Sequence, residues 1–381
     1  MHAEDRHQNI LRALRERGGV RVTDMAREMG VSPVTVRRDV ETLAERGLVR
    51  RVHGGAVLPD TTSPPGEHPA TRARELLRSS PMSFGMIVPD AGYYYPEVIK
   101  GAREAAAARG IRLVLGISQY DPSEEHAQAQ QMLDHGIDGL LISPSGRPED
   151  RSWIEELPIP AVLIERRQED DGAALELAAT DHAHGARLAV HHLAGLGRSR
   201  IALLLRADSP HATPIHHGYL AGMAAAGLEA PPDLCFIIPM PDSPGGSGDY
   251  ERRTGLFLDA VEGCRIDAAL VHNDRDAILL LQRLRARRIT VPDEMAIVAY
   301  DDEVAALADI PLSAIAPPKH AVGAAAVDLL ALRVTDPSRP PHRLSILPEL
   351  RVRSSSGVSG AVAPDEPDEP EEPEEPEEPE E

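Results

Sequence analysis

Over most of this chain, short apolar runs alternate with longer segments in which apolar residues have helical spacing. Residues 84–89 (FGMIVP) and 295–302 (MAIVAYDD) are two of these runs. Short apolar runs between helices are typical of buried parallel strands, and their exchange with helices indicates doubly wound α/β units. Because a single open sheet of so many strands would be unusually long, we expect two lobes with a cleft between them.

The predicted elements of this region alternate along the chain. We expect strands at 84–89, 112–117, 139–144, 161–165, 201–205, 235–239, 268–273 and 295–302. We expect helices at 96–110, 124–136, 182–197, 215–227, 253–263 and 276–288. The run GGSG near Gly245 is expected to be a loop, because it lacks the strand and helix that flank a phosphate-binding loop.

The first 58 residues have a different pattern, which predicts a winged helix-turn-helix. Ser32 is a good N-cap and Pro33 suits the first position of the helix that follows. Val36, Val40 and Leu43 share one face of that helix and should pack inward. The preceding helix is expected to run from a Thr23 cap to Gly30, and a hairpin is expected around Gly54–Gly55.

Side chains suited to nucleic acid lie on the hairpin and on the outer face of the helix that begins at Pro33. Residues 1–58 hold eleven arginines against eight acidic residues, whereas the whole chain has a net charge of −21. This local positive charge favours a polyanionic partner. The alternative is a small helical subdomain with solvated arginines. The candidate DNA-binding residues are Ser32, Thr35, Arg37, Arg38, Arg50, Arg51 and His53.

Two motifs in this segment, S-x-x-T-x-R-R-D and R-x-H-G-G-A, closely resemble the N-terminal domain of DeoR-type bacterial regulators. The resemblance covers the whole segment. It implies binding to double-stranded operator DNA in the manner of a repressor, with Ser32, Thr35, Arg37 and Arg38 on the recognition helix. The wing residues would contact the phosphate backbone.

The rest of the chain divides by composition. Residues 59–80 are rich in Pro, Ser and Thr and are expected to be a linker. Residues 356–381 form a Pro/Glu-rich acidic tail that we expect to be disordered, either as an idle extension or as a brake on the basic domain. The expected domains are thus 1–58, a linker, 81–355 and the tail. The chain has only two cysteines, and its sequence shows neither an apolar signal region nor an apolar run long enough to span a membrane. These features favour a cytoplasmic protein.

Residues 84–355 resemble the effector domain of LacI-type regulators, which is related to periplasmic sugar-binding proteins. The resemblance rests on PEVIKGAREAAAARG, IDGLLISPS and, above all, the stretch from Val271 to Asp302. It implies a body of two lobes between which the chain crosses three times, and a cleft that takes a sugar, nucleobase or similar metabolite. It also implies a homodimer. A single winged helix covers too few base pairs for strong discrimination, which favours a dimer independently.

Candidate ligand residues follow the predicted strands, because ligands of open α/β sheets bind beyond the carboxyl ends of the strands. Tyrosines offer a ring face and a hydroxyl to a sugar, and an amide with a carboxylate suits vicinal hydroxyls. Helix capping is the alternative for Asn273, Asp301 and Asp181, and it is the favoured role for Asp274. For the tyrosines the alternative is a loop cover or packing between the lobes, and for Ser143 it is a turn. The candidate ligand-binding residues are Asp90, Tyr94, Tyr95, Ser143, Asp181, Asn273 and Asp301.

One position departs from the LacI-type pattern. Ile215 stands where the family commonly has an arginine that grips ligand oxygens, so His216, His217 or Arg206 would have to compensate. Histidines cluster between His182 and His217, but neighbouring helical histidines diverge by about 100° and are poorly placed to share a metal. We therefore expect no metal and no cofactor.

Together these features predict a ligand-responsive DNA-binding transcriptional regulator, a repressor of carbohydrate-related genes, rather than an enzyme. An alternative is a solute-binding or sugar-modifying α/β module whose N-terminal domain contacts proteins. A third reading is a regulator whose cleft has lost its ligand. The fold class is predicted as α/β: a small winged helix-turn-helix domain, then a two-lobed periplasmic-binding-protein-like domain of doubly wound parallel sheets.

Overall fold

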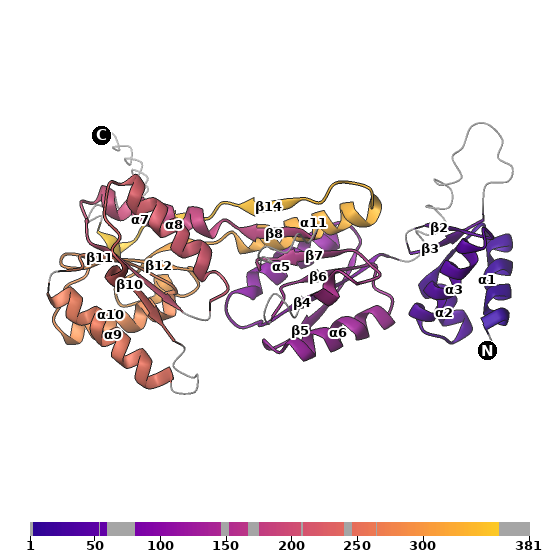
Figure 1. Ribbon diagram of the computed structural model, residues 1–381, viewed down its shortest axis with the longest axis horizontal. Coiled ribbons are helices and arrows are strands. Elements are labelled where there is room, and N and C mark those ends of the chain that lie inside the picture. Colours follow the sequence, from indigo (N-terminus) through magenta and orange to yellow (C-terminus); the bar gives the residue numbers. More distant parts are fainter. Residues whose placement is uncertain are drawn as a thin grey trace, which may run out of the picture.

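A computed structural model of the chain describes residues 3–52, 54–58, 81–145, 152–166, 175–206, 209–239, 246–263 and 265–357. Three parts lie in a row: an N-terminal head, a first lobe and a second lobe (Figure 1). The predicted linker, the acidic tail from residue 358 and the side chain of His53 lie outside the described residues.

The head is built from three helices and a small sheet. Its helices are α1 (Ala3–Arg17), α2 (Val22–Met29) and α3 (Pro33–Glu45). Its strands are β1 (Gly19–Arg21), β2 (Arg50–Val52) and β3 (Gly55–Val57), which pair antiparallel in the order β1-β3-β2. Apolar side chains of α1, α2 and α3 form one core cluster. The predicted winged helix-turn-helix is thus present.

The first lobe contains a six-stranded parallel sheet in the order β14-β8-β7-β6-β4-β5. The strands are β4 (Ser83–Val88), β5 (Arg112–Ile117), β6 (Gly139–Ile142), β7 (Ala161–Ile164), β8 (Glu176–Thr180) and β14 (Arg343–Ile346). Helices α5 (Tyr95–Ala108) and α11 (Lys319–Thr335) pack together on one face, and α6 (Pro122–Asp134) covers the other.

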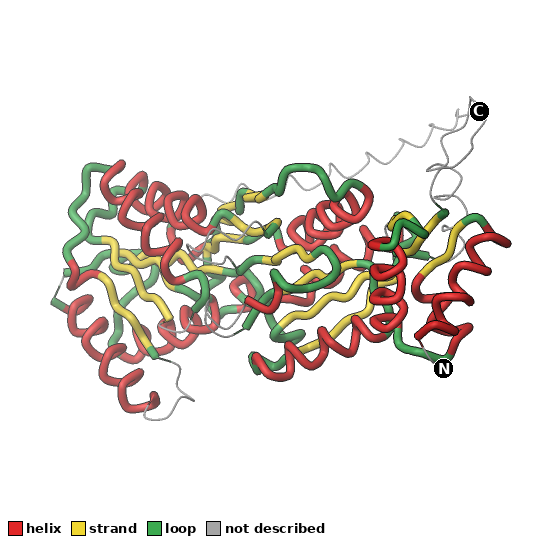
Figure 2. Tube along the Cα trace, turned by 45° about the vertical axis from the view of Figure 1, so that its right-hand side comes forward, coloured by secondary structure: helices red, strands yellow, loops and turns green. Residues whose placement is uncertain are grey.

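The second lobe repeats this plan with strand order β10-β9-β11-β12-β13-β15. The strands are β9 (Ile201–Arg206), β10 (Cys235–Ile238), β11 (Ala268–Val271), β12 (Ala296–Tyr300), β13 (Ser313–Ala316) and β15 (Glu349–Arg351). Helices α7 (His182–Gly195) and α8 (Ala212–Ala225) cover one face. Helices α9 (Gly246–Glu262) and α10 (Asp274–Ala286) cover the other, so helices flank both sheets (Figure 2).

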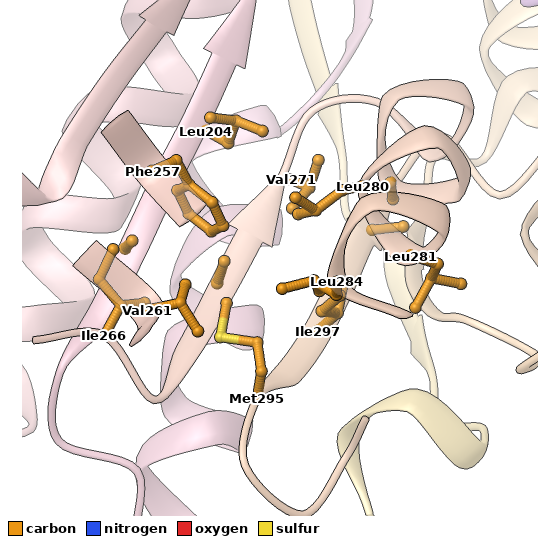
Figure 3. Close-up of a cluster of buried hydrophobic side chains, with 14 of the residues drawn as sticks. Leu204, Phe257, Val261, Ile266, Val271, Leu280, Leu281, Leu284, Met295 and Ile297 are labelled. Carbon is orange, nitrogen blue, oxygen red and sulfur yellow. The ribbon is translucent and has the colours of Figure 1, made fainter. Parts of the chain in front are cut away.

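The chain passes between the lobes three times: after β8, after β13 and after β14. Each lobe has its own apolar core. In the second lobe, Phe257 of α9 and Leu284 of α10 meet Val271 and Ile297 of the central strands (Figure 3). Because both faces of each sheet are covered, the central strands β4, β6, β7, β11 and β12 are buried along their length, as the sequence pattern predicted.

Several details differ from the sequence prediction. Strand β15 runs antiparallel to β13, so the second sheet is not wholly parallel. Helix α2 begins at Val22 without a side-chain cap, so the predicted Thr23 cap was wrong. Helix α9 begins at Gly246, within the run expected to be a loop. Ser356 is buried and hydrogen-bonded to Ser313 (2.6 Å between hydroxyl oxygens), so packed structure continues past residue 355.

Candidate functional site

The start of α3 has the predicted cap geometry. The Ser32 side chain accepts a hydrogen bond from the Thr35 backbone N–H (3.2 Å), and the two hydroxyl oxygens lie 2.9 Å apart. Pro33 occupies the first turn, and Val36 and Val40 are buried in the head core. This packing orients the helix so that Arg38 faces solvent.

The wing presents its arginines to solvent. Arg50 and Arg51 lie on β2 and are exposed. Arg51 Nη1 is 3.3 Å from Glu41 Oε1 on α3, an exposed ion pair that contributes little to stability. Arg38, Arg50 and Arg51 therefore remain available to a polyanion. Arg37 differs, because its guanidinium is half-buried against the first lobe.

A buried carboxylate that the sequence analysis missed holds α3 against α1. Asp39 accepts hydrogen bonds from Arg6 Nε (2.6 Å) and Nη2 (2.9 Å), and His7 Nε2 lies 3.2 Å from its Oδ1. Such a forked arginine–carboxylate pair fixes orientation as well as distance. The only sequence signal was an acidic residue on the apolar side of α3, between Val36 and Val40.

A second polar cluster joins the two lobes. It includes two of the three adjacent tyrosines, Tyr93 and Tyr94. Tyr93 donates its hydroxyl to Asp274 of the second lobe, and the Arg275 guanidinium lies 4.1 Å from the Tyr93 ring centre. Tyr94 donates to Glu165 (2.8 Å). Burial and the neighbouring carboxylates raise the pKa of both tyrosines, so they act as neutral donors.

Tyr95 points into the first lobe, where its hydroxyl oxygen lies 2.7 Å from the Ser143 hydroxyl. Both residues are buried, and each satisfies the other. The structure thus places Tyr93 and Tyr94 at the junction of the lobes and pairs Tyr95 with Ser143 in the interior.

Histidines and Glu165 form the centre of this interlobe cluster. The His182 and His211 rings stack with centroids 3.9 Å apart, and His182 Nε2 is 3.5 Å from Glu165 Oε2. Burial alone would raise the pKa of Glu165, but His182, the Thr180 N–H and the Tyr94 hydroxyl hold it below its usual value. Burial lowers the pKa of His211 strongly, helped by His182 and Arg166. A neutral His211 can both accept and donate a hydrogen bond.

Within the interlobe cluster, Asp301 has a buried carboxylate oxygen, Oδ1, without a hydrogen-bond partner in the described structure. The residue is 4% exposed. Burial raises its pKa to about 6, with Lys319 acting against that rise and Asp274 adding to it. Lys319 donates to the Asp301 backbone carbonyl and also pairs with Glu303. A buried carboxylate oxygen left unpaired is costly, so this position is suited to an incoming donor.

Three other candidate residues make local contacts, and for Asp181 and Asn273 these are the helix caps that the sequence analysis gave as the alternative. Asp181 caps α7 by accepting from the His184 N–H (2.8 Å), and Asn273 caps α10 by accepting from the Asp276 N–H (3.4 Å). Asp90 accepts from the Gly92 N–H (2.9 Å) in a partly exposed loop.

Asp274 does not cap a helix, contrary to expectation. It is fully buried and accepts from the backbone N–H groups of Glu303 and Val304 (2.7 Å each) as well as from Tyr93. Its carboxylate therefore binds the loop after β12 to the first lobe.

Ile215 is buried in the second-lobe core, which leaves no charged side chain at that position. Arg206 Nη1 is held 3.5 Å from Asp276, while His216 is half-buried and His217 is exposed. The side chain that does reach the interlobe cluster is His211, one helical turn earlier. Sequence reasoning missed it because neighbouring histidines obscured which one faced inward.

Basic residues at the lobe junction were also missed. Arg166 is buried and donates to the Pro144 carbonyl (3.0 Å), with its Nε unpartnered. Lys319 begins α11 at a chain crossing, with its Nζ 5.1 Å from the Tyr94 ring centre. Among the described residues, no group of three or more His, Cys, Asp or Glu side chains could hold a metal ion. No described helix is both long and apolar enough to span a membrane.

Comparison with known families matches this geometry to two domain types. Residues 6–62 match the DeoR-like helix-turn-helix domain. Residues 82–237 match the family of periplasmic binding proteins and sugar binding domain of LacI family, and residues 190–356 match the periplasmic binding protein-like domain.

Named relatives and solved structures agree with this division. The Escherichia coli (strain K12) ribose operon repressor is 28% identical over 76% of this chain and 86% of its own length. The Geobacillus stearothermophilus arabinose metabolism transcriptional repressor is 26% identical over 87% of this chain and 90% of its own. The transcriptional regulator CelR–cellobiose complex superposes with a TM-score of 0.63, at 24% identity, over 87% of this chain and 98% of that one. An Enterococcus faecium LacI family regulator with bound ribose has a TM-score of 0.57, at 20% identity, over 72% of this chain and 98% of that one.

The chain therefore joins a DeoR-like helix-turn-helix domain to a periplasmic-binding-protein-like domain of the LacI kind. It is a transcriptional regulator, as the sequence predicted.

Proposed function

We propose that this protein is a cytoplasmic repressor of carbohydrate-related genes that binds operator DNA through its head and a sugar-like effector between its lobes. Helix α3 would enter the major groove with Thr35 and Arg38 toward the bases, and Arg50 and Arg51 of the wing would contact phosphates. The effector would change operator affinity because it binds one arrangement of the lobes better than another.

The observation that carries this proposal is Asp301 Oδ1, a buried carboxylate oxygen without a partner among the described residues, in an interlobe cluster of a chain that also bears a winged helix-turn-helix. A buried carboxylate oxygen that lacks a donor favours a ligand rich in hydroxyl groups. Around it, Tyr94 and His211 offer ring faces, and Arg166 offers a free Nε. The names of the relatives, which mention ribose and arabinose, point to the same ligand class.

The remaining parts of the proposal concern assembly and organisation. We propose that Asp90, Tyr94, Tyr95, Ser143, Asp181, Asn273 and Asp301 line or support the effector site. A homodimer would place two heads on two half-sites, which a single head lacks the reach to read. The relatives are named as regulators, which supports a binding role without catalysis. Residues 59–80 would serve as the linker between head and body.

The proposal is tested by a mobility-shift titration with the DNA upstream of the protein's own gene, across a series of salt concentrations. We expect specific binding that weakens steeply with salt, because phosphate contacts release counterions. Ribose, arabinose and cellobiose are then added singly, and one of them or a related sugar should change the operator affinity. A protein that ignores this DNA at low salt, with and without sugars, would contradict the proposal.

Replacing Arg50 or Arg51 by alanine is expected to weaken binding to specific and unrelated DNA alike. Because each of these side chains would neutralise one phosphate, its removal should lower the slope of log affinity against log salt by about 1. The measurement is the salt dependence of binding by fluorescence anisotropy. An unchanged slope in both variants would place the wing away from the DNA backbone.

Effector affinity is expected to fall as the pH drops below about 6, the pKa of Asp301. The carboxylate accepts hydrogen bonds from ligand hydroxyls, whereas the protonated acid loses part of that capacity. Below its pKa the ionised fraction falls about tenfold per pH unit, and the apparent affinity should follow it. Isothermal titration at several pH values from about 5 to about 8 measures the effector affinity on both sides of that pKa. Asp301→Asn should make the affinity independent of pH over this range.

A further inference from the structure

The head rests directly on the first lobe. The contact surface of the lobe is the turn between α6 and β6, residues 135–138. Arg37 of α3 donates from Nη2 to the Ile137 backbone carbonyl (3.1 Å). A Cβ placed on Gly136 would lie 2.4 Å from the Thr23 methyl and 3.4 Å from Pro33 Cγ. Helices α2 and α3 therefore both touch this turn, which is the α6 end nearest the head in Figure 1.

The same turn reaches the wing. A Cβ on Gly54, between β2 and β3, would lie 3.3 Å from Asp138 Oδ1. The Asp138 carboxylate also acts electrostatically on Arg37, whose pKa is lowered by burial at this contact. Asp138 is held in place from behind, since its Oδ2 accepts from the Ser83 N–H (2.9 Å). A fixed carboxylate thus stands between the recognition helix and the wing.

A crevice of about 290 Å³ lies along this junction. Its head side is formed by Arg37, Glu41 and Arg51, and its body side by Asp138 and the prolines Pro158 and Pro160. In a winged helix-turn-helix, the phosphate backbone of DNA passes between the recognition helix in the major groove and the wing. The first lobe fills one side of that space.

We propose that the 135–138 turn is an autoinhibitory dock for the head, in which Asp138 takes the place that a DNA phosphate takes when the operator is bound. Docking and DNA compete for the same face, so the head must leave the turn before α3 can enter a major groove. This inference rests on the proposed operator binding. It adds that the protein has a built-in state of low DNA affinity in which Arg37 is engaged by the body.

A designed disulfide tests the dock directly. The Cβ position at Gly136 is 3.6 Å from the Thr23 Cβ, within the range that a disulfide spans. The double variant Thr23→Cys with Gly136→Cys is oxidised, its crosslink confirmed by peptide mass mapping, and operator binding measured by mobility shift. We expect the operator affinity of the oxidised protein to be lower than that of the reduced protein by on the order of tenfold or more. Reduction with dithiothreitol should restore the affinity of the reduced sample.

The single variants Thr23→Cys and Gly136→Cys, oxidised in parallel, control for the substitutions and for the native cysteines. A crosslinked protein that binds DNA as well as its reduced form would overturn the dock, and so would a crosslink that fails to form. If neither the wild-type protein nor the reduced variants bind DNA, then the proposed operator binding fails instead. The two failures are therefore distinguishable.

A second pair of variants tests the dock in the opposite direction. Gly136→Asn keeps the left-handed backbone, which asparagine tolerates, but adds a side chain against Thr23 and Pro33. The matched control is Gly110→Asn, at the end of α5 in the same lobe, where φ is also positive and nothing lies within 4 Å of the added Cβ. We expect Gly136→Asn to bind the operator several-fold more tightly and Gly110→Asn to match wild type. Equal affinities in the two variants would contradict the dock.

Discussion

Arg38→Ala is expected to abolish operator binding at the protein concentrations of a mobility-shift assay while leaving effector binding intact. Arg38 is exposed on α3, one turn beyond the capped Ser32–Thr35 start and opposite the buried Val36 and Val40. An arginine that reads a guanine edge contributes about 1–3 kcal/mol, and a dimer loses this at both half-sites. The expected loss is therefore about 2–6 kcal/mol of binding free energy per dimer.

Two further variants separate base reading from charge. Arg38→Lys keeps the charge but loses the forked donor geometry, so it should bind specific and unrelated DNA with similar, weak affinity. Arg109→Ala removes an exposed arginine that pairs with Asp328 on the body, far from the head in sequence, and should bind like wild type. Unchanged operator affinity in Arg38→Ala would refute the assignment of α3 as the recognition helix.

Asp301→Ala is expected to bind the operator normally and to lose its response to the effector. The Asp301 carboxylate is buried and has an oxygen without a partner in the described structure. Hydrogen bonds to a charged acceptor contribute about 1.5–3 kcal/mol each, so effector affinity should fall about tenfold to a hundredfold. Isothermal titration with the active sugar gives the affinity, and mobility shift with and without that sugar gives the response.

Asp267→Ala is the matched control for this substitution. Asp267 is another buried carboxylate of the second lobe, but it stands just before β11, at the opposite end of the strand from Asn273, and accepts from the Ser199 and Arg200 N–H groups. It should lower thermal stability without changing the effector dissociation constant of the folded protein. A normal response in Asp301→Ala would exclude the interlobe cluster as the effector site.

Local patterns in the sequence were sufficient for much of this protein. The Ser32 cap, Pro33 in the first turn and the Val36, Val40 and Leu43 face were all confirmed, because capping and amphipathic spacing act within a few residues. The predicted strands and helices of the body were confirmed for the same reason, but strands β8, β13 and β14 and helix α11 were not predicted. Strands β1 and β15 were not predicted, since a three-residue strand is defined by its partner and carries almost no pattern of its own.

The roles of polar residues depended on contacts between distant segments. Asp274 was expected to cap α10, yet it meets Tyr93, which precedes it by 181 residues. Asp39 pairs with Arg6 across 33 residues. Arg37 is a predicted DNA-binding residue, and in this structure it donates to a carbonyl 100 residues away. No spacing rule connects positions so far apart, because the fold alone brings them together.

The amino-acid sequence alone indicates the class of protein, a basic winged head on a two-lobed α/β body. Helix caps, apolar strand runs and local charge depend on neighbouring residues, so the sequence shows them directly. The tertiary structure determines which buried groups lie together. Asp301 Oδ1 has no donor among the described residues, His211 stacks on His182, and the α6–β6 turn packs against α3 and the wing. Those relations arise from three chain crossings and from the seating of the head on the first lobe, and both are set by packing between segments remote in sequence.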